Sequence, residues 1–346
     1  MLSDRRFDLS IIIPAFNEQE NLFECVNKIN KCYGIINYEI IIIDDGSFDD
    51  TWKICENLKK QYDNIVIQHQ TNAGVSVARN KGIEIAKANK IMFVDADDNL
   101  VDNWAEIISD YIKLDYDVIQ MNICYEDNIK NEMQGNTISI DPSMLMKILL
   151  NRKRYYNSEL GYSLVESTHG VCGKIYNKTI IHNNFIRFDE KATIGEDILF
   201  YMEILSHCKS CILVDKLLYI ISYNPLSSTR RYNPRLFNGV SYFSKILCDK
   251  YPDEKLTDEL VENKYYQIYW HVYCGVLYNL GKKCELNLRD KWKILHDILK
   301  QSEIQNALDY LHVHEKSIGI SKRERCYIEL LRKNLGIIYI WIHSFK

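Results

Sequence analysis

The chain has 346 residues, of which 47% are apolar and 26% charged, and it contains 14 Gly and 5 Pro. These values exclude a disordered or fibrous chain and allow one large domain with an appendage, or two domains. Residues 1–225 carry 23 basic and 33 acidic side chains, whereas residues 226–346 carry 20 and 14. The acidic first part argues against nucleic-acid binding. The basic second part could meet an anionic membrane or a phosphorylated partner, or could be solvated helix faces.

Eleven Cys occur without a signal-like N-terminal segment, which predicts reduced thiols and a cytoplasmic location. No run reaches the roughly 18 apolar residues of a spanning helix. The longest candidate, Leu335 to Phe345, is too short and contains His343. With the basic residues before it, this segment leaves two alternatives open: peripheral contact with the inner face of a membrane, or docking onto a helical domain.

Short β-branched runs alternate with stretches of helical period over the first 120 residues, which predicts βαβ units and a mostly parallel α/β sheet. Ala78, Gly82 and Ala86 lie four residues apart, so one face of the third helix is nearly bare and can approach the sheet closely. Near-continuous apolar runs predict strands covered on both faces at Leu9–Ile13, Glu39–Ile43, Ile65–Gln68, Ile91–Val94 and Val118–Met121.

The pattern changes twice further along the chain. From Pro142 to Pro225 it is mixed, with a clear helix from about Gly195 to His207, and after Pro234 it is almost wholly helical. We expect a domain over residues 1–232, divided into residues 1–125 and 126–232, and a helical domain over 233–346. Tyr and Trp side chains at helical spacing between Tyr265 and Tyr278 predict core packing or a homodimer contact.

Polar side chains follow three of the predicted strands, at the edge where open parallel sheets bind their ligands. The segments are Pro14 to Glu18, Asp44 to Ser47 and Asp95 to Asp98. No G-x-G-x-x-G follows the first strand and no G-x-x-x-x-G-K-[ST] occurs, which argues against dinucleotide cofactors and P-loop chemistry.

Asp95, Asp97 and Asp98 place three carboxylates on one turn, and a divalent cation relieves their repulsion most simply. Mg²⁺ or Mn²⁺ held by one or two carboxylates keeps positions open for phosphate oxygens. One alternative is an Asp-rich turn into a helix capped by Asp102. A calcium loop is disfavoured because Leu100 occupies the position that requires Gly.

Asp45 closes the second strand, where its acceptor oxygens could bind a base N–H or ribose hydroxyls. The alternative is turn chemistry, with Ser47 and Asp50 capping the next helix.

Four segments in series, SIIIPAFNEQENL, IIIDDGSFDDTW, TNAGVSVARNKG and IMFVDADD, resemble the signature blocks of family 2 glycosyltransferases. The resemblance is strong over residues 8–102 and weakens to about residue 232. It implies a GT-A fold, a UDP-sugar donor and a metal that bridges the donor phosphates. It also implies donor contacts from Pro14, Ala15, Phe16, Glu18, Asp45, Arg79, Asp95 and Ala96, and metal ligands Asp97 and Asp98.

The same resemblance implies a carboxylate base in an acidic pair at a helix start, and Glu196-Asp197 fits. Because Thr193 and Glu196 have capping-box spacing, Glu196 has a competing role and Asp197 is the better candidate base. Further candidates are Lys174 near the sugar or phosphate, His169 on the acceptor side, and Arg230 and Arg231 as cations for the diphosphate. The two Arg could equally be a solvated loop, and His169 could be structural.

These features predict a metal-dependent, inverting hexosyltransferase that transfers a hexose or N-acetylhexosamine to a saccharide or lipid-linked saccharide in surface polysaccharide synthesis. One rival is a sugar-nucleotide nucleotidyltransferase, although its Gly-rich, basic loop is missing after the first strand. The other rival is a catalytically silent nucleotide- or saccharide-binding scaffold, which would be expected to lack acids at the metal or base positions.

Overall fold

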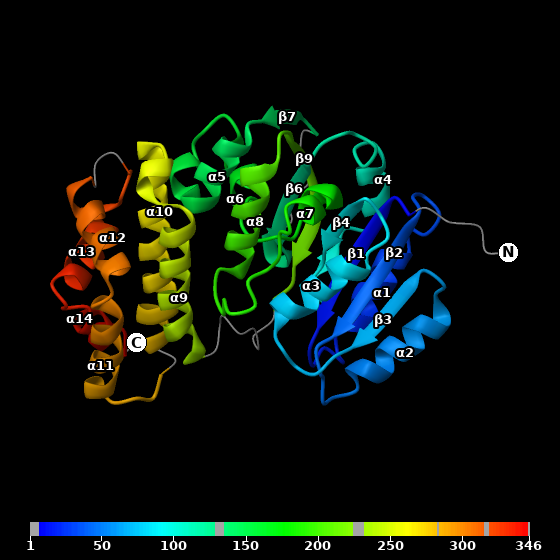
Figure 1. Cartoon of the computed structure of the whole chain (residues 1–346). Helices are drawn as coiled ribbons and strands as arrows, with labels where there is room; N and C mark the ends of the chain where they lie inside the picture. The colour runs from blue at the N-terminus through cyan, green and yellow to red at the C-terminus, as the bar shows by residue number, and fades with distance from the viewer. Residues whose placement is uncertain (1–6, 129–134, 224–231, 282–283, 315–317, 345–346) are drawn as a thin grey trace. The chain divides into compact units, whose positions relative to one another are not determined.

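The computed structural model describes residues 7–128, 135–223, 232–281, 284–314 and 318–344. It confirms the predicted α/β fold followed by a helical C-terminal region (Figure 1). The chain forms two compact units. The first comprises Met1–Leu145, Tyr156–Glu190 and Glu196–Asn224, and the second comprises Met146–Tyr155, Lys191–Gly195 and Pro225–Lys346.

The first unit is built on a mixed sheet with the strand order β3-β2-β1-β4-β8-β6-β9-β5, and β7 pairs with β9. The strands are β1 Leu9–Ala15, β2 Tyr38–Asp44, β3 Ile65–His69, β4 Lys90–Phe93, β5 Asn99–Leu100, β6 Val118–Tyr125, β7 Thr137–Ile140, β8 Lys174–Asn177 and β9 Cys211–Ile221. All five predicted strands are present, with their ends at the predicted residue or shifted by one to four residues. β1 to β4 are parallel neighbours, and β6 runs parallel to β9.

The sheet differs from the expectation at β8, which lies antiparallel between β4 and β6. Its sequence, Lys-Ile-Tyr-Asn, is short and begins with a charged residue, so its periodicity does not predict a central strand. β8 is buried nonetheless, because its Lys side chain finds internal partners. Strand β9, which borders β6 on the other side, was also not predicted.

Helices cover both faces of this sheet. They are α1 Leu22–Asn30, α2 Thr51–Gln61, α3 Val75–Ile85, α4 Trp104–Ser109, α6 Gly161–Glu166, α7 Lys178–Asn183 and α8 Glu196–His207, with α5 Pro142–Leu150 spanning the unit boundary. Alternate residues of β1 face opposite layers. Ile11 and Ile13 join a core with Val26 of α1, Leu58 of α2 and Trp104 of α4.

Ile12 of β1 faces the other layer and meets the bare face of α3. A Cβ added to Gly82 would lie 2.3 Å from Ile12 Cγ2, far inside van der Waals contact. The predicted close approach of this helix to the sheet is therefore confirmed. Only glycine at this position permits it.

We expect Gly82→Ala to lower the free energy of unfolding by about 1–3 kcal/mol through overpacking. This clash outweighs the gain of about 1 kcal/mol that alanine ordinarily brings to a helix interior. Urea unfolding of the variant measures the change. In an Ile12→Ala background the same substitution should cost almost nothing, and an undiminished cost there would contradict the steric explanation.

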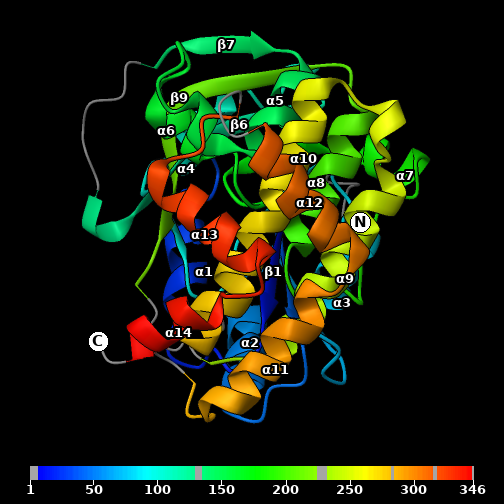
Figure 2. The ribbon, with the colours of Figure 1, turned by 90° about the vertical axis from the view of Figure 1, so that its left-hand side faces the viewer.

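The second unit consists of helices whose apolar faces enclose their own core. They are α9 Arg235–Lys250, α10 Asp258–His271 with a π-helical continuation at Val272–Tyr278, α11 Leu288–Leu299, α12 Ser302–Val313, α13 Lys322–Arg332 and α14 Ile337–Ser344. Short 3₁₀ turns occur at Glu126–Asn128, Arg152–Tyr155 and Asp253–Lys255. α11 and α14 lie side by side within this unit (Figure 2). Tyr265, Tyr266 and Tyr269 are buried. Within the described ranges, no helix combines the length and apolar character that crossing a membrane requires.

Candidate active site

The carboxyl ends of β1 and β2 bring the first two polar segments together. Ala15 pairs with Asp44 in parallel register, and the Asp45 N–H donates to the Ala15 carbonyl at 2.8 Å. Asn17 adopts φ +57° and links the two loops, because its N–H donates to Ser47 Oγ and its Oδ1 accepts from the Phe48 N–H. The predicted capping box of Ser47 and Asp50 is wrong, because helix α2 begins at Thr51 and Asp50 at its N-cap makes no side-chain capping bond.

Asp45 is buried and holds the segment that leads into α3. Its Oδ1 accepts from Gln70 Nε2 and the Ala73 N–H, and its Oδ2 accepts from the Gly74 N–H, each at 2.8 Å. The turn alternative assigned the local hydrogen bonds to Ser47 and Asp50 and left Asp45 free, whereas Asp45 itself binds the loop after β3. Asp45 therefore shapes the wall of the site, whatever else it binds.

Two exposed aromatic rings lie in the loops that follow β1 and β2. Phe16 is 40% exposed and Phe48 is 83% exposed, and their rings meet edge to face at 5.5 Å between centroids. Exposed aromatic faces suit the stacking of a nucleobase. Phe48 was missed in the sequence analysis; the only signal for it is a large apolar residue within a polar turn.

Glu18 lies in the loop that follows β1 and is partly buried. Its Oε2 accepts from Asn21 Nδ2 at 2.8 Å, and its N–H donates to Thr51 Oγ1. Burial raises the pKa of Glu18 to about 7, and the negative charge of Asp97 adds to the rise. A cation or a donor N–H placed near this carboxyl would favour its charged form and lower its pKa again.

The aspartate turn follows β4 and rests on the end of β9. Asp98 is buried, with Oδ2 accepting from the Tyr219 hydroxyl at 2.8 Å and Oδ1 from the Ser222 N–H at 2.9 Å. Burial raises the pKa of Asp98 to about 7, and the charge of Asp95 adds to it. Ala96 is buried, whereas Asp95 and Asp97 are partly exposed.

The aspartate turn offers carboxylate oxygens that could bind a divalent cation. Among the described residues, no group of three or more His, Cys, Asp or Glu side chains is arranged to hold a metal ion. Mg²⁺ and Mn²⁺ in nucleotide sites commonly take only one or two carboxylates and complete their shell with phosphate and water. The turn fits that pattern. Of the two candidate ligands, Asp97 is partly exposed, whereas Asp98 is buried and both of its oxygens accept hydrogen bonds from β9 and the residue after it.

Arg79 of α3 joins the aspartate turn to the start of α8. Its Nη2 lies 2.9 Å from Asp95 Oδ1 and its Nη1 lies 3.5 Å from Glu196 Oε1. The guanidinium carbon lies 5.3 Å from the centroid of the Phe188 ring, and the residue is buried. Arg79 was predicted from the sequence as a donor contact, but its pairing with Glu196 was not predicted.

Glu196 is largely enclosed by these partners. Burial raises its pKa to about 7, and the neighbouring charge of Asp197 adds to the rise, while Arg79 opposes it. A carboxyl group with a raised pKa stabilises the folded state most below its unfolded value of 4.5, and that contribution is lost as the pH rises through about 7.

We therefore expect Glu196→Gln to flatten the pH dependence of stability. Between pH 5 and 7.5 the wild type should lose about 1–3 kcal/mol of unfolding free energy relative to the variant, given 1.36 kcal/mol per unit of pKa shift and partial exposure. Urea unfolding at several pH values gives the difference. Parallel curves for the two proteins would contradict the raised pKa of Glu196.

Asp197 follows in the first turn of α8 and is partly exposed. Its Oδ1 accepts from the Ile198 N–H at 2.8 Å. Its Oδ2 faces Gly170, where an added Cβ would lie 3.5 Å away. The structure thus brings Asp197 beside the loop that precedes β8, and Arg79 brings the adjacent Glu196 to the aspartate turn.

Lys174 departs from the expectation that it lies near the sugar or phosphate. It is fully buried, and its Nζ donates to the carbonyls of Ser167, His169, Gly170 and Cys172 at 2.9–3.3 Å. An ammonium group surrounded in this way orders its own loop. This burial of Lys174 could not be predicted from the sequence, because a lysine near a predicted site ordinarily indicates a contact with the ligand.

Three other predicted residues have different outcomes. His169 is exposed, and its carbonyl is one of those bound by Lys174. Arg230 and Arg231 lie outside the described residues.

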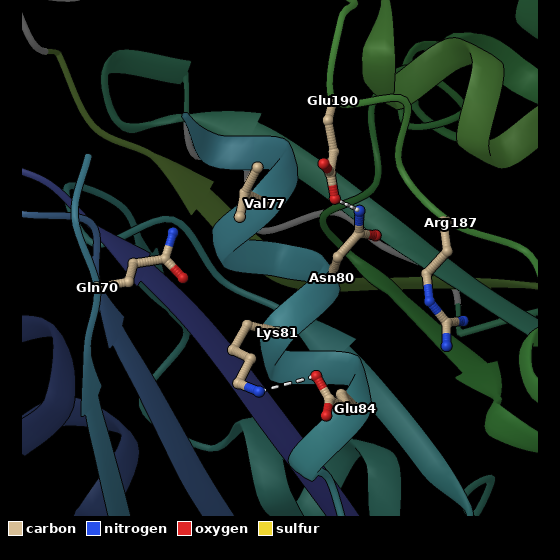
Figure 3. Close-up of a pocket in the computed structure, with 7 residues that line it drawn as sticks. All are labelled: Gln70, Val77, Asn80, Lys81, Glu84, Arg187 and Glu190. Atoms are coloured by element: carbon tan, nitrogen blue, oxygen red, sulfur yellow. Dashed lines mark hydrogen bonds and ion pairs between the residues drawn. The ribbon is translucent and has the colours of Figure 1, made fainter. Parts of the chain in front are cut away.

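A pocket of about 290 Å³ lies along α3 and contains none of the predicted site residues. Figure 3 shows its lining side chains, with Lys81 paired to Glu84 and Asn80 bound to Glu190. Gln70 links this pocket to Asp45. Its mixed charges point to no particular ligand, so the aspartate turn remains the better candidate site.

A family model described as Glycosyl transferase family 2 matches residues 10–175. The uncharacterized glycosyltransferase YibD of Escherichia coli is 32% identical over 186 residues, which are 52% of this chain and 51% of that protein. The poly(ribitol-phosphate) beta-N-acetylglucosaminyltransferase TarP of Staphylococcus aureus is 27% identical, over 69% of each chain.

Other matches are partial in length or concern the fold alone. The minor teichoic acid biosynthesis protein GgaB of Bacillus subtilis is 30% identical over 70% of this chain, but the match spans only 26% of GgaB, and that with YibD spans about half. The crystal structure of S. aureus TarS 1-349 in complex with UDP-GlcNAc superposes with a TM-score of 0.65 at 17% identity, covering 97% of this chain and 90% of that one.

Proposed function

The chain belongs to glycosyltransferase family 2 and has the GT-A fold, and from this premise we propose that it transfers a hexose or N-acetylhexosamine from a UDP-sugar to a saccharide or lipid-linked saccharide hydroxyl with inversion. Teichoic acid and other surface polysaccharides are the proposed products, by analogy with relatives such as GgaB and TarP.

One observation carries this proposal. The guanidinium of Arg79 contacts Asp95 of the aspartate turn and Glu196 beside Asp197. Within the first unit, Arg79 thereby links the aspartate turn, which suits a metal-bound diphosphate, to the acidic pair at the start of α8, which suits a general base. This is the arrangement that transfer from a nucleotide sugar requires, because the leaving group and the acceptor must meet at one anomeric carbon.

In the proposed reaction, Asp197 accepts the proton of the acceptor hydroxyl as its oxygen attacks the anomeric carbon. The new bond from that carbon to the acceptor oxygen forms as its bond to the UDP oxygen breaks, so UDP leaves and the configuration inverts. Glu196 supports Asp197 through its pairing with Arg79. Phe16, Phe48 and Glu18 line the nucleoside side, next to Pro14 and Ala15.

Asp97, aided by Asp98, would hold Mn²⁺ or Mg²⁺ in this proposal. A mannosyltransferase of Pyrobaculum calidifontis, with a TM-score of 0.54 at 12% identity over 99% of this chain and 88% of that one, was solved with GDP-Man and Mn²⁺. When bound, such a cation neutralises charge that develops on the leaving diphosphate. We propose residues 1–125 as the donor half of the site and residues 126–232 as its acceptor half.

The test is to incubate the protein with Mn²⁺, candidate acceptors and a panel of UDP-sugars, and to assay UDP release. We expect release with at least one sugar, loss of release with EDTA, and a decrease of at least about 100-fold in Asp97→Ala. The control is Asp110→Ala, an exposed aspartate at the end of α4, which should retain activity.

Two results would contradict the proposal. Metal-dependent UDP binding without transfer would identify a scaffold, whereas formation of a UDP-sugar from UTP and a sugar phosphate would identify a nucleotidyltransferase. A cytoplasmic location, membrane contact through the C-terminal helices and a homodimer stay predictions.

A further inference from the structure

The loop before β8 directs four consecutive carbonyl groups into the protein. Lys174 Nζ donates hydrogen bonds to the carbonyls of His169, Gly170 and Cys172 at 3.2, 3.0 and 3.3 Å. The carbonyl between them, that of Val171, accepts from the buried Tyr176 hydroxyl at 3.0 Å. Two buried side chains of β8 thus fix the orientation of every peptide plane from His169 to Cys172.

This orientation determines where the amide groups point. In a trans peptide the N–H is directed opposite to the carbonyl of the preceding residue, and these peptides are trans. The N–H groups of Gly170, Val171 and Cys172 therefore point away from Lys174 and Tyr176. Within the part of the chain that the structure describes, these three N–H groups have no hydrogen-bond acceptor. Such groups bind water or a ligand oxygen.

The row of amides runs between the two parts of the candidate active site. At one end, Gly170 adopts φ +69° and faces Asp197. A Cβ added to Gly170 would lie 3.5 Å from Asp197 Oδ2. At the other end, the Cys172 side chain is hydrogen-bonded to the Tyr219 hydroxyl, which donates to Asp98 Oδ2 at 2.8 Å and accepts from the Asp95 N–H at 3.1 Å, so Cys172 lies next to the aspartate turn. A ligand that contacts these amides would therefore lie between the diphosphate side and the base.

We propose that the backbone N–H groups of Gly170, Val171 and Cys172 form an oxygen-binding subsite for the sugar that is transferred, and that Lys174 and Tyr176 are the positioning residues that orient it. This inference rests on the proposed function. The ligand oxygen is an uncharged hydroxyl or acetamido carbonyl, because a phosphate at this place would be repelled by Asp197 and Asp95.

Affinity measurements can separate the sugar from the nucleotide. With Mn²⁺ present, isothermal titration calorimetry gives Kd for UDP and for the best-bound of UDP-glucose, UDP-galactose and UDP-GlcNAc. In Tyr176→Phe we expect the UDP-sugar to bind about 3- to 10-fold more weakly, with UDP unchanged, because the Val171 peptide is no longer held. A general loss of structure would weaken both ligands.

A matched control is available in the same unit. The Tyr38 hydroxyl also donates to a backbone carbonyl, that of Ile29, at 3.0 Å, and Tyr38 is equally buried. Tyr38→Phe removes the same kind of bond away from the loop. It should leave the ratio of the two Kd values at the wild-type level.

A second variant tests the amide directly. Replacing Val171 by its α-hydroxy acid converts one amide to an ester and removes a single N–H, while the side chain stays. We expect the same selective loss of UDP-sugar affinity. If both variants weaken the two ligands equally, or weaken neither, the inference is wrong while the proposed function stands. If the wild type binds neither UDP nor any UDP-sugar, the proposed function fails and the inference fails with it.

Discussion

Asp197→Asn is expected to lower kcat for sugar transfer by about 1,000-fold, within the range of about 100- to 10,000-fold that general-base catalysis contributes. The amide keeps the size of the side chain and can still accept from the Ile198 N–H, but it cannot take the proton of the acceptor. Because Asp197 would act in the chemical step, Kd for UDP should stay within about twofold of the wild type. Steady-state kinetics with the active donor, and calorimetry with UDP, measure the two quantities.

The adjacent acid supplies the comparison. Glu196 is paired with Arg79, so Glu196→Gln should reduce kcat by much less than Asp197→Asn, about 10-fold or below. The opposite order, with Glu196→Gln the more damaging variant, would transfer the role of base to Glu196. Equal and complete loss of UDP binding in both would point to a structural role for the pair.

Arg79→Met is expected to lower the free energy of unfolding by about 2–4 kcal/mol. Removal of one partner from a buried ion pair leaves the other charges without compensation and costs about 3–5 kcal/mol. Here the Asp95 side chain is 36% exposed, which reduces the cost, whereas Glu196 at 19% is closer to the buried case. Urea unfolding and the melting temperature both report the change.

Lys81→Met is the control for this substitution. Lys81 lies two positions further along α3 and pairs with Glu84 across an exposed i,i+3 spacing. Pairs of that kind contribute about 0.3–0.5 kcal/mol, so this variant should differ little from the wild type. A similar loss in both variants would show that α3 is sensitive to any change of charge, rather than to the loss of Arg79.

The first part of the fold follows from simple periodicity. Strands β1, β2, β4 and most of β6 are apolar runs covered on both faces, and β-branched residues also mark β3, although this edge strand is only partly buried. β8 and β9 could not be predicted this way. β8 has only four residues and starts with Lys174, whose burial depends on carbonyls of a loop that itself has no periodic pattern.

The candidate site was predictable in its acids but not in their partners. The positions of Asp45, Asp97 and Asp197 follow from strand ends and a helix start, all of which are local features. The pairing of Arg79 with Glu196 spans 117 residues in sequence, and no local pattern specifies it. The same applies to Asp98, whose oxygens are held by Tyr219 and the Ser222 N–H more than 120 residues later.

An antiparallel strand enters a sheet at the edge where its parallel neighbours leave it. The loop before β8 therefore lies at the edge of the sheet that carries the candidate site, and β8 leads away from that edge, held by β4 on one side and β6 on the other. Under the proposed function, insertions or deletions between β6 and β8 would change acceptor recognition without altering the register of β1 to β4. Under the same proposal, such a layout would separate the evolution of acceptor choice from that of nucleotide binding, and the chain between β6 and β8 would be the segment to exchange between relatives when specificity is engineered.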